Sequence, residues 1–151
     1  MPDSYCYIAT HIIFSTKERF KFFHGEHHHT MHQYIAGIIK NVNGFPIIIN
    51  GTNDHIHILA LLPKEMTIAE FVRTIKSNSS KWFRTTHNPK FGWQQGYAAF
   101  SVSRSRLDNV IEYIRNQEAH HKTMSFEEEY KKYIEKHGFV NDQKDVSPLR
   151  G

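Results

Sequence analysis

Two histidines stand one residue apart in an otherwise aliphatic segment, NGTNDHIHILALLP at residues 50–63. Side chains two residues apart on a β-strand share a face, so His55 and His57 would present two imidazoles about 7 Å apart along the strand. Such a pair can bind one divalent cation or contact one phosphate. Two ordinary polar histidines on a half-exposed strand would give the same pattern, and the spacing alone leaves both interpretations open.

A second candidate group lies in the segment YIRNQEAHH, where Tyr113, Gln117 and His120 have i, i+4 and i+7 spacing. On a helix these side chains run along one edge. Gln117 could complete a metal site begun by the histidines, and Tyr113 could be a nucleophile aimed at whatever the metal holds. The alternative is a boundary tyrosine with its hydroxyl in water, and a His120 that merely favours the helix terminus.

Positive charge is concentrated in residues 71–107, which hold seven basic residues and no acidic residue. The rest of the chain has 12 basic and 15 acidic residues. Cations interleaved with aromatic rings are typical of a nucleic-acid surface, although a solvated basic face over core aromatics would have the same composition. The residues expected to contact DNA are Arg73, Lys76, Lys81, Arg84, Arg104 and Arg106.

These candidates must be positioned by regular elements, and hydrophobic periodicity predicts the order βαββαβ followed by two helices. Strands are expected at residues 5–15, 45–50, 55–62 and 97–103. Helices are expected at residues 29–42, from Thr67 with a capping box to Glu70, from Ser105 with Asp108 to about residue 121, and from Ser125 with Glu128 to Gly138. This order predicts an α+β, ferredoxin-like split βαβ fold: an antiparallel sheet with helices on one face, plus C-terminal helices.

The 151 residues predict a single domain, expected at residues 1–140, with a flexible tail at residues 141–151. Cys6 is the only cysteine, so no internal disulfide can form and a reducing, cytoplasmic setting is expected. No apolar run approaches the roughly 20 residues that a membrane-spanning helix needs, so no membrane association is expected.

Taken together, four segments resemble the HUH single-tyrosine transposases, small insertion-sequence enzymes that act on single-stranded DNA, and their REP-associated relatives. The segments are THIIFSTKERF, NDHIHILALLP, GYAAFSVSRS and YIRNQEAHH, and the similarity runs from about residue 5 to residue 138. The second and fourth segments, in this order and spacing, are the specific ones. The histidine run at residues 27–29 lies outside the pattern and is interpreted at most as an adventitious metal site.

The resemblance implies that His55, His57 and Gln117 hold Mg²⁺ or Mn²⁺ and that Tyr113 attacks the scissile phosphate. Cleavage would leave a 5′-phosphotyrosine and a free 3′-OH, and the same chemistry in reverse would rejoin strands. The DNA would carry hairpin ends, and the protein would be a homodimer whose tyrosine helix serves the partner's histidine pair. The alternatives are a domesticated REP-associated nickase and a non-catalytic ferredoxin-like nucleic-acid binder.

Overall fold

The computed structural model describes residues 4–120 and 124–138 of the chain. It divides into two compact units, Met1–Gln117 and Glu118–Gly151, which are described here separately. The predicted tail at residues 141–151 lies outside the described residues, and the expected domain boundary at residue 140 stays a prediction. No helix in the described part of the chain is long and apolar enough to cross a membrane.

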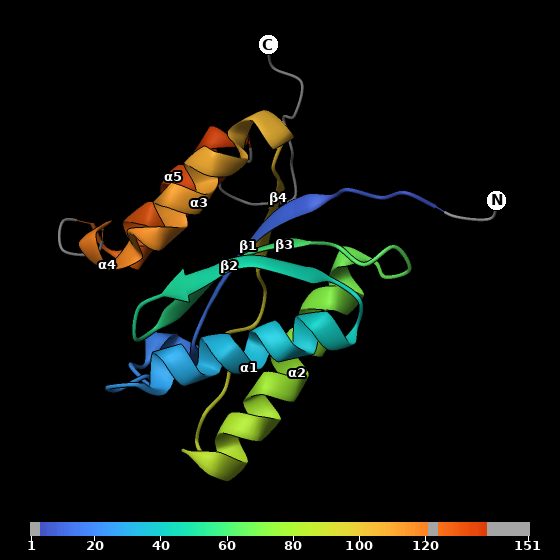
Figure 1. Ribbon diagram of the computed structural model, residues 1–151. Helices are drawn as coiled ribbons and strands as arrows, with labels where there is room; N and C mark the ends of the chain where they lie inside the picture. Colours follow the sequence, from blue (N-terminus) through green and yellow to red (C-terminus); the bar gives the residue numbers. More distant parts are fainter. Residues whose placement is uncertain (1–3, 121–123, 139–151) are drawn as a thin grey trace. The chain divides into compact units, whose positions relative to one another are not determined.

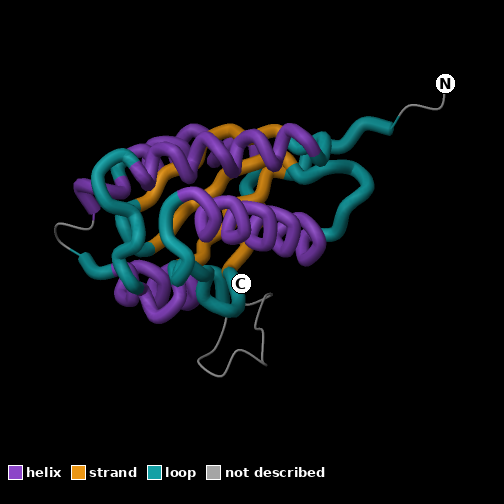
Figure 2. The backbone as a smooth tube through the Cα atoms, turned by 90° about the horizontal axis from the view of Figure 1, so that it is seen from below, coloured by secondary structure: helices purple, strands orange, loops and turns teal. Residues whose placement is uncertain are grey.

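The first unit is built on one sheet of four antiparallel strands in the order β2-β3-β1-β4. Figure 2 shows the strands in orange, with helices in purple. Its strands are β1 (Ala9–Ser15), β2 (Phe45–Gly51), β3 (His55–Leu61) and β4 (Ala98–Ser101). Two helices connect them, α1 (His27–Asn41) after β1 and α2 (Ile68–Thr86) after β3. This strand order and connectivity confirm the predicted ferredoxin-like α+β fold.

Alternation along the two central strands gives the sheet two chemically different faces. Ile12 pairs with Ile58 and Phe14 with Ile56, and all four side chains are buried in the main hydrophobic core. Residues from α1 and α2 complete that core, and both helices cover this face (Figure 1). The intervening residues, which include His55 and His57, therefore point to the opposite face.

The predicted capping box at the start of α2 is confirmed. The Thr67 hydroxyl accepts a hydrogen bond from the Glu70 backbone N–H, and the Glu70 carboxylate accepts one from the Thr67 backbone N–H. The first strand, in contrast, begins at Ala9 and not at residue 5. Ala9, the first residue of β1, pairs with Leu61, the last residue of β3, and Tyr5 is 83% exposed.

The segment after β4 differs from the expected single helix. A 3₁₀ turn, η2 (Arg104–Arg106), precedes α3 (Leu107–Arg115), and Ser105 caps neither of them. The helix ends at Arg115, with Asn116 as its C-cap, and the short helix α4 (Gln117–His120) follows. α3 packs against β2 on the histidine face, so the sheet carries helices on both sides.

The second unit contains α5 (Phe126–Lys136). The predicted capping box is confirmed, because Ser125 accepts from the Glu128 backbone N–H and the Glu128 carboxylate bonds back to Ser125. The helix ends before Gly138, whose φ of 86° lies in the left-handed region that glycine adopts at helix C-termini.

Candidate active site

His55 is the first residue of β3, and its ring is fixed by the turn that precedes it. The Asp54 carboxylate accepts a hydrogen bond from His55 Nδ1–H at 2.9 Å, and the Thr52 hydroxyl donates to the same carboxylate oxygen at 3.1 Å. Because Nδ1 carries the proton in this bond, the lone pair of the neutral ring resides on Nε2. A carboxylate behind the distal nitrogen is the usual support for a histidine that binds metal.

His57 follows two residues later on the same face, and its ring is held by the neighbouring strand. His11 Nε2 lies 2.8 Å from His57 Nδ1, and both side chains are buried. With the proton on His57 Nδ1, donated to His11 Nε2, His57 Nε2 would be the second electron-pair donor of the group. The His55 and His57 rings are 5.3 Å apart between centroids, and one nitrogen of each lies within 4.8 Å of the other.

The helix that carries Tyr113 is fastened to the sheet by Asn50. This residue pairs with His57 across the β2–β3 ladder, and its amide donates to the carbonyls of Ile114 at 2.9 Å and Arg115 at 3.1 Å. Those carbonyls belong to the last turn of α3, which has no further helical donors for them. The fully buried Ile114 side chain anchors the same turn, so the position of Tyr113 follows from two independent attachments.

Tyr113 and Gln117 both face the histidines of their own chain. The Tyr113 ring lies 5.8 Å from His57 and 6.4 Å from His11, in each case edge to face. Gln117 is buried, and its side-chain oxygen Oε1 lies 3.0 Å from His55 Nε2. The predicted residues His55, His57, Tyr113 and Gln117 therefore lie together, whereas the His120 side chain lies outside the described residues.

The contact between His55 and Gln117 tests whether this site suits a cation. The protonated Nδ1 of His55 faces Asp54, so the Nε2 lone pair and the Gln117 carbonyl oxygen converge on one point. Two such atoms at this distance can share one proton or serve as neighbouring ligands of one metal ion. Adjacent ligands of an octahedral ion at about 2.1 Å would be roughly 3.0 Å apart, and so the donor pair fits a small divalent ion.

Three of the six predicted basic contacts line a hollow of about 990 Å³ between α2 and residues 90–97. Arg73, Lys76 and Arg84 line it, and Lys81 does not. Lys76 also has a structural task, because its ammonium donates to the carbonyls of Gln94 and Gly96 while burial lowers its pKa. The polar and aromatic lining would accept phosphates and bases.

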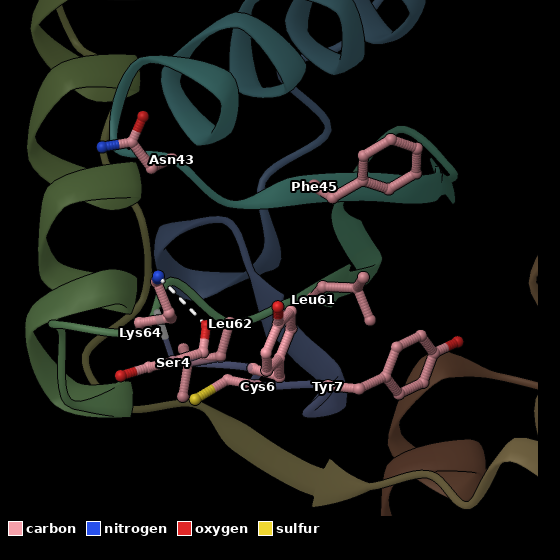
Figure 3. Close-up of a pocket in the computed structure, with 9 residues that line it drawn as sticks. Ser4, Cys6, Tyr7, Asn43, Phe45, Leu61, Leu62 and Lys64 are labelled. Carbon is pink, nitrogen blue, oxygen red and sulfur yellow. Dashed lines mark hydrogen bonds between the residues drawn. The ribbon is translucent and has the colours of Figure 1, made fainter. Parts of the chain in front are cut away.

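The remaining basic residues, Arg104 and Arg106, lie in η2, away from this hollow. The Arg104 guanidinium stacks 4.5 Å from the centroid of the Tyr7 ring. Tyr7 borders a smaller hollow of about 520 Å³ beside β2 and the end of β3, where Lys64 Nζ donates to the Ser4 carbonyl (Figure 3). The predicted basic residues therefore do not all line one hollow.

Three residues of the site were not found by sequence reasoning: His11, Asn50 and Asp54. Asp54 and Asn50 flank the His55–His57 pair in the sequence, and a polar residue beside a suspected ligand is a usable signal for a supporting role. His11 is 46 positions away from His57. Its signal was a histidine in an apolar strand, which matters only once the register of β1 against β3 is known.

Comparison with known proteins identifies the family and the fold. A family model described as "Transposase IS200 like" matches residues 4–117, which ends at the site residue Gln117. No curated protein matches the sequence. A crystal structure described as a candidate transposase from Deinococcus radiodurans has a TM-score of 0.61 and 21% identity, over 78% of this chain and 96% of that chain.

A second solved structure, of a REP-associated tyrosine transposase bound to a REP hairpin, has a TM-score of 0.60 and 13% identity. The structural match covers 100% of this chain and 98% of the chain of that transposase. At these identities the two structures establish the shared fold, and the family follows from the sequence match over most of the chain. This protein belongs to the family of IS200-like transposases.

Proposed function

We propose that this transposase cleaves single-stranded DNA with Tyr113 as the nucleophile. The phenolic oxygen of Tyr113 attacks phosphorus, the bond to the 3′ oxygen breaks, and the DNA 5′ end becomes linked to the tyrosine. The phenolic proton is lost and a proton is gained by the departing 3′-OH, so atoms and charge balance. The observation that carries this proposal is that Tyr113 of α3 lies beside the His55 and His57 pair of β3.

The phosphotyrosine link retains the energy of the broken phosphodiester. A second 3′-OH can therefore attack the same phosphorus and release Tyr113, which rejoins the strand to a new partner without nucleotide hydrolysis. Positioning is the contribution of the protein scaffold: Asn50 fixes the turn that carries Tyr113, and the sheet fixes the histidines.

His55, His57 and Gln117 would hold the divalent ion, which we infer to be Mg²⁺ or Mn²⁺. When bound, such an ion polarises the scissile phosphate and offsets the charge that builds on its non-bridging oxygens. Asp54 favours the His55 tautomer with its proton on Nδ1 and its electron pair on Nε2, and His11 holds the His57 ring in place through its Nδ1. Gln117 contributes an amide oxygen, the type of hard ligand that these ions accept.

The DNA is proposed to be a single strand with a hairpin end. The hollow beside α2 supports this, because it combines basic side chains with Trp93 and Tyr97 on a scale that suits a nucleic-acid strand. The similar fold of a transposase solved with a REP hairpin adds support for hairpin ends.

The direct test is a labelled single-stranded oligonucleotide with a hairpin end, incubated with the protein in Mg²⁺, Mn²⁺ or EDTA. An SDS-resistant protein–DNA adduct is expected with either metal and not with EDTA. Binding measured in parallel by gel shift should persist in EDTA. Binding without any adduct under all metal conditions would instead favour a non-catalytic nucleic-acid binder.

The role of the α2 hollow gives a separate prediction about salt. Each phosphate that is neutralised on a single strand contributes about −0.7 to the slope of log K against log salt. Replacing Arg73 and Arg84 together by Ala should therefore flatten this slope by roughly 1 to 1.5, measured by fluorescence anisotropy.

A matched control for that double variant is available on the same helix. Lys81 does not line the hollow. Lys81→Ala should therefore change the slope of log K against log salt by less than half of the change in the double arginine variant. An unchanged slope in the Arg73 and Arg84 variant would show that DNA does not bind along this face of α2.

We infer that one chain supplies a complete cleavage site, because Tyr113 lies beside the His57 of its own sheet. The expectation of a site shared between two subunits stays a prediction. The contact between Tyr113 and His57 of one chain favours a site within a single chain. Mixing His57→Ala protein with Tyr113→Phe protein distinguishes the two. A site within one chain predicts no recovery of adduct, because every chain lacks one component.

The mixing experiment requires that exchange between any dimers be verified by native mass spectrometry. A site shared between subunits would restore adduct in the mixture, up to about a quarter of the wild-type site number if exchange were random. That recovery would overturn the single-chain site and support the homodimer implied by the family resemblance.

A further inference from the structure

A second pair of histidines lies on α1, outside the candidate active site. His28 and His32 are four residues apart, so their side chains project from adjacent turns of the same helical face. Their ring centroids are 5.8 Å apart and the rings are inclined at 78°. For His55 and His57 the centroid distance is 5.3 Å and the angle between the rings is 75°, so the rings of the two pairs have nearly the same spacing and inclination.

His32 has an unsatisfied nitrogen. It is 8% exposed, and among the residues that the structure describes its Nε2 is the buried side-chain atom without a hydrogen-bond partner. A buried polar atom without a partner is destabilising, because its lost hydration is not replaced, so such an atom points to a ligand. With the proton on Nδ1, this nitrogen would offer its electron pair to a cation.

The tautomer of His28 presents a second electron pair. His28 Nδ1 lies 2.9 Å from the Gly25 carbonyl oxygen, which can only accept, so Nδ1 carries the proton and Nε2 the lone pair. His29 is the other neighbour of His32 on this face, and its Nε2 lies 3.3 Å from the Gln33 side-chain nitrogen Nε2. The available donors are therefore one Nε2 from His28 and one from His32.

His32 is also uncharged at neutral pH. Burial, and to a lesser extent the neighbouring His28, His29 and His55, lowers its pKa from 6.5 to about 3. A neutral imidazole binds a metal ion without first losing a proton. The carboxylate of Glu26, two residues before His28, adds negative charge at this end of the helix.

We propose that His28 and His32 form a second metal site, which binds a divalent transition ion of the Zn²⁺, Co²⁺ or Ni²⁺ class. Imidazole nitrogens suit these ions, whereas Mg²⁺ prefers oxygen ligands. Two nitrogens at about 2.1 Å from one ion place ring centroids roughly 5 Å apart, so a small side-chain rotation from 5.8 Å closes the site. Solvent completes the coordination, and the ion cross-links the first two turns of α1.

The site can be tested without measuring activity. Zn²⁺ titrated into the full chain should shift the ring ¹⁵N resonances of His28 and His32 in long-range ¹H–¹⁵N spectra, and Mg²⁺ should not shift them. Calorimetry should find one Zn²⁺ fewer bound to His28→Ala than to wild type. His28 is only half-buried, so this variant should fold. His24→Ala removes an exposed histidine before α1 and should keep the wild-type stoichiometry.

His57→Ala separates the two sites. It should also lose one Zn²⁺, while the His28 and His32 resonances still shift as in wild type. The proposal is overturned if Zn²⁺ leaves these two rings unshifted while shifting the His57 ring, or if His28→Ala binds as many ions as wild type. In that case the partner of His32 Nε2 is water.

Discussion

Tyr113→Phe is expected to remove the covalent protein–DNA adduct, with a loss of at least about a thousandfold in the rate of cleavage, because the attacking oxygen is absent. The phenylalanine ring should keep the packing against His57 and His11, so folding and DNA binding should remain. The measurements are adduct yield by SDS gel electrophoresis, affinity by gel shift, and the melting temperature.

Tyr97→Phe is the matched control for the nucleophile. Tyr97 is 37% exposed and lines the hollow beside α2, so its hydroxyl is available to DNA but lies outside the histidine group. This variant should form adduct at nearly the wild-type rate. A normal adduct in Tyr113→Phe would disprove the assignment, and peptide mapping of the adduct would then identify the tyrosine used.

The second large effect is expected from His57→Ala, which should reduce metal-dependent cleavage by about a hundredfold or more while changing DNA affinity little. His57 is an inferred ligand of the ion, and the basic residues that supply most of the affinity lie elsewhere. Mn²⁺ binding by calorimetry and cleavage at several Mn²⁺ concentrations would show whether the loss arises from metal affinity.

Because His57 is buried, the alanine variant also leaves a cavity and an unpaired nitrogen on His11. His57→Gln keeps more of the volume and can still bond to His11, so it serves as the second variant. Unchanged Mn²⁺-dependent cleavage in both folded variants would remove His57 from the site. A loss of DNA binding equal to the loss of cleavage would indicate a structural role instead.

The fold class was predictable from the amino-acid sequence, and so was the grouping of His55, His57, Tyr113 and Gln117, whose chemical roles stay predictions. Alternating aliphatic and histidine side chains in one strand predict a buried face and a histidine face, and this holds for β3. The capping boxes at Thr67 and Ser125 were also predictable, because a cap involves residues only three positions apart. Local spacing is sufficient for these features, since the period of a strand or helix decides them.

Local spacing was not sufficient at the ends of elements. The first strand begins at Ala9 because its partner β3 ends at Leu61, a fact about pairing and not about residues 5–8. Likewise the expected helix from Ser105 breaks at Asn116. Asn50, on a distant strand, bonds the last carbonyls of α3, and that bond is not visible in the sequence around residue 116.

The contacts that support the site residues could not be predicted from the sequence, because they depend on the tertiary structure. The register of β1 against β3 places His11 beside His57, and the tight turn before β3 places Asp54 and Thr52 against His55. The same is true of α3 lying on the sheet of its own chain, which brings Tyr113 to His57. The physical reason is that a metal or phosphate site needs donors converging in three dimensions. Strand register and helix packing, which set that convergence, depend on contacts between residues far apart in the chain.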